Sequence, residues 1–130
     1  MNEVIYYEHI PMLPVSQNAL TSGTNRNKVY TYTAHMTAGD YYRRLRMRLE
    51  VTFNKAMEAV KKRQGPFTFV LMLPHTIAGK SRYDLDNFSY PVFTSSGKSG
   101  LMRLIKNWII SKSRDVKDGF EIYVYEETDS

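Results

Sequence analysis

The stretch Phe67-Thr68-Phe69-Val70-Leu71-Met72-Leu73, which Pro74 closes, is the longest apolar run in this chain of 130 residues. Short apolar runs bounded by turn residues are typical of a central strand that is buried on both faces. Pro74 ends the strand because proline has no N–H to donate to a neighbouring strand. We therefore expect the fold to be organised around a buried strand over residues 67 to 73.

The segment before this strand has the pattern of a long amphipathic helix. The side chain of Thr37 can cap such a helix, and Asp40 favours the positive end of the helix dipole. Gly65-Pro66 stops it, so we predict a helix from Asp40 to Arg63. Its apolar residues recur at steps of three and four, which places them on one face: Tyr42, Leu45, Leu49, Phe53, Ala56, Met57 and Val60.

The N-terminal part of the chain has less regular patterns. Met1 to Ile10 is rich in β-branched and aromatic residues with rough alternation, and we predict a strand there. Ser16 to Asn27 is polar and is predicted to be an exposed loop. Lys28 to Thr33 alternates Tyr and Thr with Val, which fits either a short strand or an extended loop.

The C-terminal part is predicted in the same way. Pro91 and the Ser- and Gly-rich run from Ser95 to Gly100 interrupt any long helix. Apolar residues at helical spacing then predict a second helix between Ser99 and Ile110, with a strand that opens over Trp108 to Ser111 as the alternative.

The chain ends on a turn and a strand. Asp115 to Gly119 predicts the turn, and the alternation from Phe120 to Tyr125 predicts a half-buried last strand. The whole order predicts a single domain over residues 1 to 130 of the α/β (α+β) class, in which a small mixed sheet packs against two main helices.

The composition narrows the classes of function. The absence of cysteine excludes disulfides, a thiolate zinc site and a cysteine nucleophile, and it fits a reducing, cytoplasmic setting. No apolar run is long enough to span a bilayer, and the N-terminus lacks a basic signal-peptide region, so no membrane partner is expected. The net charge of +5 favours a polyanionic partner.

Asp84 and Asp86 are the residues best suited to chemistry. If the segment after the central strand is extended, residues two apart point the same way, and both carboxylates can meet one Mg²⁺ ion. Lys80 and Arg82 lie just upstream and would hold a DNA backbone. The structural alternative is an Asx turn in this segment, with Asn87 capping the next helix.

The same segment resembles the core of RusA-type Holliday-junction endonucleases. That family carries a basic stretch and then Asp-Leu-Asp-Asn, after a hydrophobic strand that ends near a proline. Here Leu73-Pro74 is followed by Lys80-Ser81-Arg82-Tyr83-Asp84-Leu85-Asp86-Asn87. The family also begins with a strand, a proline-rich turn and then Ser and Asn, as in Ile10-Pro11-Met12-Leu13-Pro14-Val15-Ser16-Gln17-Asn18. The likeness runs from Ile10 to Asn87.

The resemblance implies a homodimer that cuts four-way or other branched DNA symmetrically and needs Mg²⁺, in recombination, repair or phage DNA processing. Asp84 and Asp86 would be the catalytic and metal-binding residues. In addition to Lys80 and Arg82, outer DNA contacts are expected from Arg43, Arg46, Arg103 and Lys106. For the basic residues of the long helix the alternative is a solvated face, on which Glu50 and Glu58 pair locally.

Two departures from the family pattern motivate a second hypothesis. Where the family has a lysine three residues after the asparagine, this chain has Tyr90, followed by Pro91. Where the family has a further acidic residue, Leu101-Met102-Arg103-Leu104-Ile105 has none. The alternative is therefore a catalytically inactive RusA-fold phage protein, acting in the host cytoplasm, that binds DNA or that inhibits or assists a protein partner.

Overall fold

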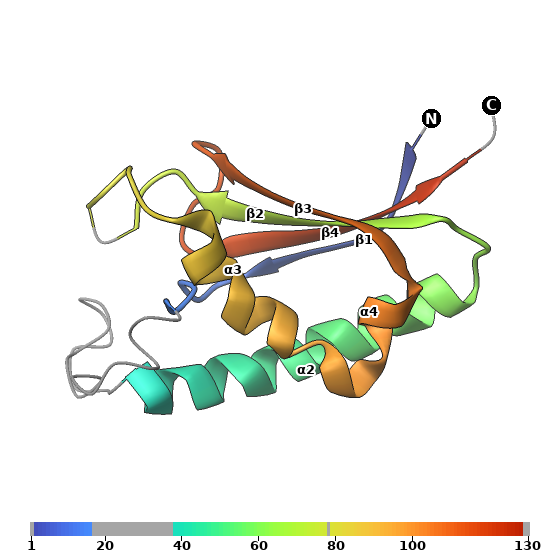
Figure 1. Ribbon diagram of the computed structural model, residues 1–130, viewed down its shortest axis with the longest axis horizontal. Coiled ribbons are helices and arrows are strands. Elements are labelled where there is room, and N and C mark those ends of the chain that lie inside the picture. The colour runs from blue at the N-terminus through green and yellow to red at the C-terminus, as the bar shows by residue number, and fades with distance from the viewer. Residues whose placement is uncertain (1, 17–37, 78, 129–130) are drawn as a thin grey trace.

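The computed structural model describes residues 2–16, 38–77 and 79–128. A four-stranded sheet is covered on one side by helices, as Figure 1 shows. The strands are β1 (Asn2–Ile10), β2 (Phe67–Pro74), β3 (Ile105–Ser113) and β4 (Phe120–Glu127). The helices are α2 (Ala38–Lys61), α3 (Leu85–Thr94) and the four-residue α4 (Leu101–Leu104), with a 3-10 turn, η2 (Gly97–Ser99), before α4.

The sheet is mixed, as the sequence predicts, and the fold belongs to the α+β class. Its strand order is β1-β4-β2-β3, in which β2 pairs with β4 antiparallel and with β3 parallel. The predicted first and last strands are confirmed. The helix predicted from Asp40 to Arg63 is confirmed as α2, two residues further toward the N-terminus. Thr37, the loop over Ser16 to Asn27 from residue 17 onward, and the Lys28–Thr33 segment lie outside the described residues.

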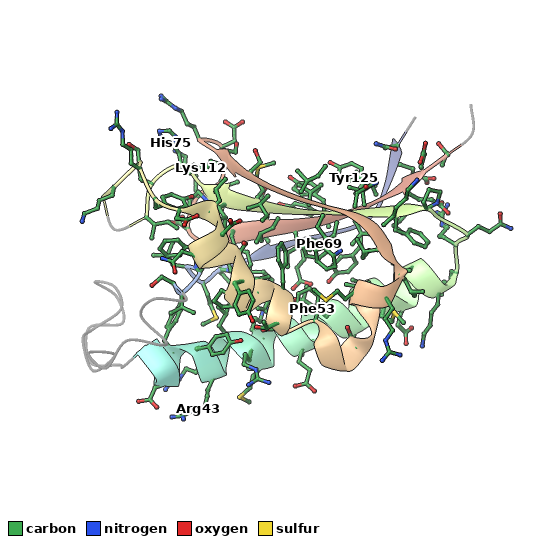
Figure 2. All side chains as sticks on the ribbon, viewed as in Figure 1. Arg43, Phe53, Phe69, His75, Lys112 and Tyr125 are labelled. Carbon is green, nitrogen blue, oxygen red and sulfur yellow. The ribbon has the colours of Figure 1, made fainter. Side chains whose placement is uncertain are left out.

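The core lies between β2, β4 and α2. Phe67, Phe69, Leu71 and Leu73 of β2 are buried and alternate with half-buried residues, so the prediction that β2 is buried on both faces is wrong. The reason is that helices cover only one side of the sheet. The buried stripe of α2 meets the β2 side chains there, with the rings of Phe53 and Phe69 6.0 Å apart. Figure 2 shows Phe69 and Phe53 facing each other across this layer.

The segment after residue 99 is the main correction to the predicted elements. The helix expected between Ser99 and Ile110 ends at Leu104, and β3 begins at Ile105, earlier than the alternative strand at Trp108. The apolar spacing of this short run fits both periodicities. Parallel pairing with β2 gives hydrogen-bond partners to one edge of β3 and places Trp108 beside Phe69, with ring centroids 4.6 Å apart.

The sequence predicts that Pro91 interrupts any long helix, and Pro91 lies inside the short helix α3, which ends three residues later at Thr94. A proline removes one backbone hydrogen bond from a helix interior. Here the loss is offset because Pro91 is buried in the core side of α3, and its carbonyl accepts hydrogen bonds from Tyr42 Oη (3.2 Å), Thr94 Oγ1 (3.1 Å) and Ser95 Oγ (2.9 Å). The bond from Tyr42 also joins α3 to α2.

We call the side of the sheet away from the helices the open face. Its middle row crosses all four strands as Tyr7, Tyr123, Val70 and Ile109, and Tyr7 and Ile109 are each 48% exposed. The rings of Tyr7 and Tyr123 lie 4.8 Å apart. By the same strand register, the two flanking rows of the open face are Val4, Tyr125, Thr68 and Asn107, and His9, Glu121, Met72 and Ser111.

No helix in the described ranges is long and apolar enough to cross a membrane.

An ion pair between Glu8 of β1 and Arg48 of α2 ties the first strand to the long helix. Tyr6 Oη also donates to Glu8, and Arg48 donates to Thr52 Oγ1 (2.7 Å). Burial by itself would raise the pKa of Glu8. The hydrogen bonds from Tyr6 and Arg48, together with the Arg48 charge, hold that pKa below its ordinary value.

We expect Glu8→Gln to destabilise the protein at neutral pH by about 2 kcal/mol, because it leaves Arg48 without its charge partner. A carboxylate with a lowered pKa stabilises the fold above its unfolded-state pKa, near 4.5, and loses this effect as the pH falls. The difference between wild type and variant in urea unfolding should therefore shrink below about pH 4.5. Glu58→Gln, at an exposed position of α2, is the matched control. A difference that persists undiminished at pH 3 would contradict this account.

Candidate functional site

The two aspartates lie at the N-terminus of α3, on the loop that leaves the carboxyl end of β2. Asp84 is the N-cap residue, and its Oδ1 accepts a hydrogen bond from the backbone N–H of Asp86 (3.0 Å). Asp86 belongs to the first helical turn, so the extended arrangement expected for the pair is wrong. The Asx-turn alternative is confirmed, except that Asp84 caps the helix instead of Asn87. Both aspartates are exposed.

The loop that carries the aspartates is fixed to the sheet by Tyr83. Its hydroxyl donates to the carbonyl of Pro74, and burial raises the pKa of Tyr83 to about 12, so the phenol keeps its proton. Lys112, from the end of β3, donates to the carbonyl of Ser81 (2.7 Å) and lies over the Tyr83 ring, 3.9 Å from its centroid. Two neighbouring strands thus hold the segment that leads to Asp84.

These two carboxylates can serve a hard cation. Oδ1 of Asp84 is used in the cap, which leaves Oδ2 of Asp84 and the carboxylate of Asp86 as oxygen ligands. Mg²⁺ commonly takes one or two protein carboxylates and completes its octahedron with water and phosphate oxygens, so the donor set fits. Within residues 2–16, 38–77 and 79–128, no group of three or more His, Cys, Asp or Glu side chains is placed to hold a metal.

Lys80 and Arg82 flank the aspartates as the sequence predicts, and both are exposed. Residues that the sequence analysis missed lie at the same end of the sheet: Lys112 at the end of β3, and Arg114 and Lys117 in the turn that follows. Figure 2 shows Lys112 near His75, at the end of β2. A strand prediction for residues 105–113 would have found them, since the carboxyl ends of parallel strands meet at one edge.

The other predicted DNA contacts do not join this cluster. Arg103 and Lys106 lie where β3 begins, and Lys112 pairs with Leu73 near its end. Seven residues at about 3.3 Å each separate Ile105 from Lys112, or roughly 23 Å. The Leu101–Ile105 segment, where the RusA pattern has its further acid, ends at Ile105, which pairs with Phe67 at the start of β2. Tyr90, in place of the lysine, is 55% exposed on α3.

Arg43 and Arg46 lie on the helix side of the molecule. They line a groove of about 320 Å³ between α2 and the α3–η2 segment, together with Ser95 and Ser99. Arg43 forms an ion pair with Asp40, and the Arg46 guanidinium lies 5.7 Å from the Tyr42 ring centroid. The structure therefore separates the six predicted DNA contacts into three places.

The chain matches no protein-family model, no curated protein and no solved structure.

The cap role of Asp84 can be separated from any role as a metal ligand, because asparagine caps helices about as well as aspartate. We expect Asp84→Ala to lower the free energy of unfolding by about 1 kcal/mol, and Asp84→Asn to change it by only a few tenths. Urea denaturation followed by circular dichroism measures both. Equal losses in the two variants would show that the charge of Asp84 stabilises the fold and that the cap hydrogen bond does not.

Proposed function

We propose that this protein is a RusA-like, Mg²⁺-dependent endonuclease that acts on branched DNA such as four-way junctions, in recombination or phage DNA processing. The observation that carries the proposal is the exposed Asp84–Asp86 pair at the start of α3, at the same end of the sheet as cations from three segments of the chain. Lys80 and Arg82 lie upstream of the pair, Lys112 ends β3, and Arg114 follows it. Carboxylates for a metal next to cations for phosphates are what phosphodiester hydrolysis needs.

The roles follow from the chemistry of each group. In the proposed reaction a water oxygen attacks phosphorus, one P–O ester bond breaks, and the leaving oxygen takes a proton. Asp84 and Asp86 would bind Mg²⁺, which when present stabilises negative charge on the phosphate and lowers the pKa of a bound water. Lys80 and Arg82 would hold the strand by its phosphates. The helix N-terminus adds backbone N–H groups that favour anions.

We expect wild-type protein with Mg²⁺ to cleave a fluorescently labelled four-way junction, and Asp84→Asn to abolish cleavage because the metal loses a charged ligand. Denaturing gels measure the product. Asp84→Asn keeps the cap, so folding is preserved. Glu58→Gln, which removes one carboxylate from an exposed site on α2, should cleave like wild type. No cleavage by the wild type in either Mg²⁺ or Mn²⁺ would overturn the proposal.

The second candidate is the inactive RusA-fold protein that binds DNA or a protein partner. The observation that favours it is that, within the described residues, no third His, Cys, Asp or Glu side chain joins Asp84 and Asp86 in a metal-binding group. If the DNA-binding form is correct, the junction is bound but not cut, and Asp84→Asn binds it as well as wild type does; if the partner is a protein, the junction is neither cut nor bound.

For the homodimer, the open face is the surface we propose. A two-fold axis parallel to the strands, between β4 and β2, would set β1 of one copy over β3 of the other. Tyr7 would then meet Ile109, and Tyr123 would meet Val70, so that the aromatic half of each face packs on the aliphatic half of its partner. Glu121 would face Met72 and no second acid. No Lys or Arg occupies the three rows of this face.

We expect Ile109→Glu to convert the dimer to monomers, because it buries a charge between two packed sheets. Val51→Glu is the matched control, since Val51 is 50% exposed on α2 and Ile109 is 48% exposed. Sedimentation velocity measures both variants beside wild type. A monomeric wild type at high protein concentration, or equal dissociation by both variants, would contradict the proposed interface.

A further inference from the structure

A pocket of about 610 Å³ lies beside the Asp84 loop, between the end of β2, the Pro11–Leu13 segment and the turn that joins β3 to β4. Its apolar lining includes Leu13, Pro74 and Val116. Its polar lining includes His75, Arg114 and Lys117. Apolar walls with a few charged groups are the usual build of a ligand site, and this volume falls in the range of such sites.

Burial and hydrogen bonds fix the turn that carries Arg114 and Lys117. Val116 is buried, its N–H donates to the Ser113 carbonyl (3.4 Å), and the Asp115 N–H donates to Ser113 Oγ (3.1 Å). At the far end of the turn, a Cβ on Gly119 would lie 1.9 Å from the carbonyl oxygen of Ile10. Gly119 (φ 144°) is therefore required for this close approach, and the turn packs closely against the end of β1. The backbone positions of Arg114 and Lys117 follow from these contacts.

The opposite wall is held as well. The carbonyl of Pro74 accepts the Tyr83 hydroxyl, and the backbones of Ile77 and Lys80 exchange hydrogen bonds of 3.0 and 3.1 Å. His75 and Thr76 lie between these two fixed points. The pocket therefore lies between two constrained segments. Because these segments are already ordered, the protein loses less conformational entropy when a ligand binds.

The lining suits a ligand with an apolar part and an anionic part. Leu13 is half-buried and offers apolar surface for a base beside the buried Pro74 and Val116, while Arg114 and Lys117 are exposed cations for phosphates. Asp118 is the acid in the lining. A base inside a duplex is stacked on its neighbours and cannot enter a pocket, whereas an unpaired base at a branch or in a single strand can.

We propose that this pocket binds one unstacked nucleotide of a single-stranded segment of nucleic acid, with its base against the apolar wall and its flanking phosphates on Arg114 and Lys117. The proposal rests on the nucleic-acid function proposed above. It does not rest on catalysis, and it gives the protein a means to prefer branched or single-stranded DNA over plain duplex.

The test is fluorescence anisotropy with a fluorescein-labelled oligo-dT strand of about ten nucleotides, and with a duplex of equal length, in EDTA so that cleavage plays no part. The double variant Arg114→Ala/Lys117→Ala should weaken strand binding about fivefold or more and lower the slope of log affinity against log salt by about 1.4, the value for two lost phosphate contacts. Lys61→Ala/Lys62→Ala removes the same charge from the far end of α2 and is the control.

A second variant tests the pocket without changing its charge. Thr76 is exposed, so Thr76→Met should fold while filling part of the space with a side chain that has no ring to stack on a base, and it should reduce binding of the strand but leave the duplex unaffected. Three results would overturn the proposal: equal losses in the two double variants, no effect of Thr76→Met on strand binding, or displacement of the strand by dTMP at equal concentration. All of these binding measurements are made without metal. They therefore test the pocket separately from the nuclease proposal, which is tested by cleavage with Mg²⁺.

Discussion

The contact between one face of β2 and the apolar stripe of α2 is the constraint on which the rest of the structure depends. Phe69, Leu71 and Leu73 are fully buried there, against α2 residues that include Leu49 and Phe53. Each buried side chain of this size contributes about 1.5–3 kcal/mol relative to an exposed one. Because β2 pairs with both β3 and β4, fixing it on α2 also fixes its neighbours. The N-terminal strand is then added at the outer edge of β4, where Glu8 pairs with Arg48.

The position of the candidate site follows from the direction of β2. The strand ends at Pro74 on the sheet edge where β3, its parallel neighbour, also ends. The loop from residue 75 to Asp84 leaves from that edge, and Lys112 and Arg114 arrive at it from β3. Asp84 and Asp86 thus lie near cations that are distant in the sequence. Their place at the start of α3 also suits the helix without any ligand, since acids stabilise a helix N-terminus.

Helices cover only one side of the sheet, and this leaves side chains exposed on the other side. With all helices on one side, the open face leaves Tyr7 and Ile109 about half exposed, and Glu121 contacts other side chains of that face, His9 among them. The hydroxyls of Tyr7 and Tyr123 donate to Glu121 at 2.7 and 3.1 Å, and the bond to Glu121 is the largest cause that raises the pKa of Tyr7 to about 12. An exposed patch of aromatic and aliphatic side chains such as Tyr7 and Ile109 is unusual on a surface that contacts only solvent.

The sequence by itself determined β1, β2, β4 and α2, because each has a local pattern long enough to predict one kind of element, and it offered the Asx turn as one of two arrangements of the Asp84 segment. Only the tertiary structure decided that residues 105–113 form a strand, since their apolar spacing fits a helix equally well until β2 offers a parallel edge. It also decided that α3 continues through Pro91, whose carbonyl gains partners from α2 and from the residues that follow. The gathering of Lys112, Arg114 and Lys117 at the same end of the sheet as Asp84, and the separation of Arg103 and Lys106 from it, depended on strand direction, which no local pattern contains.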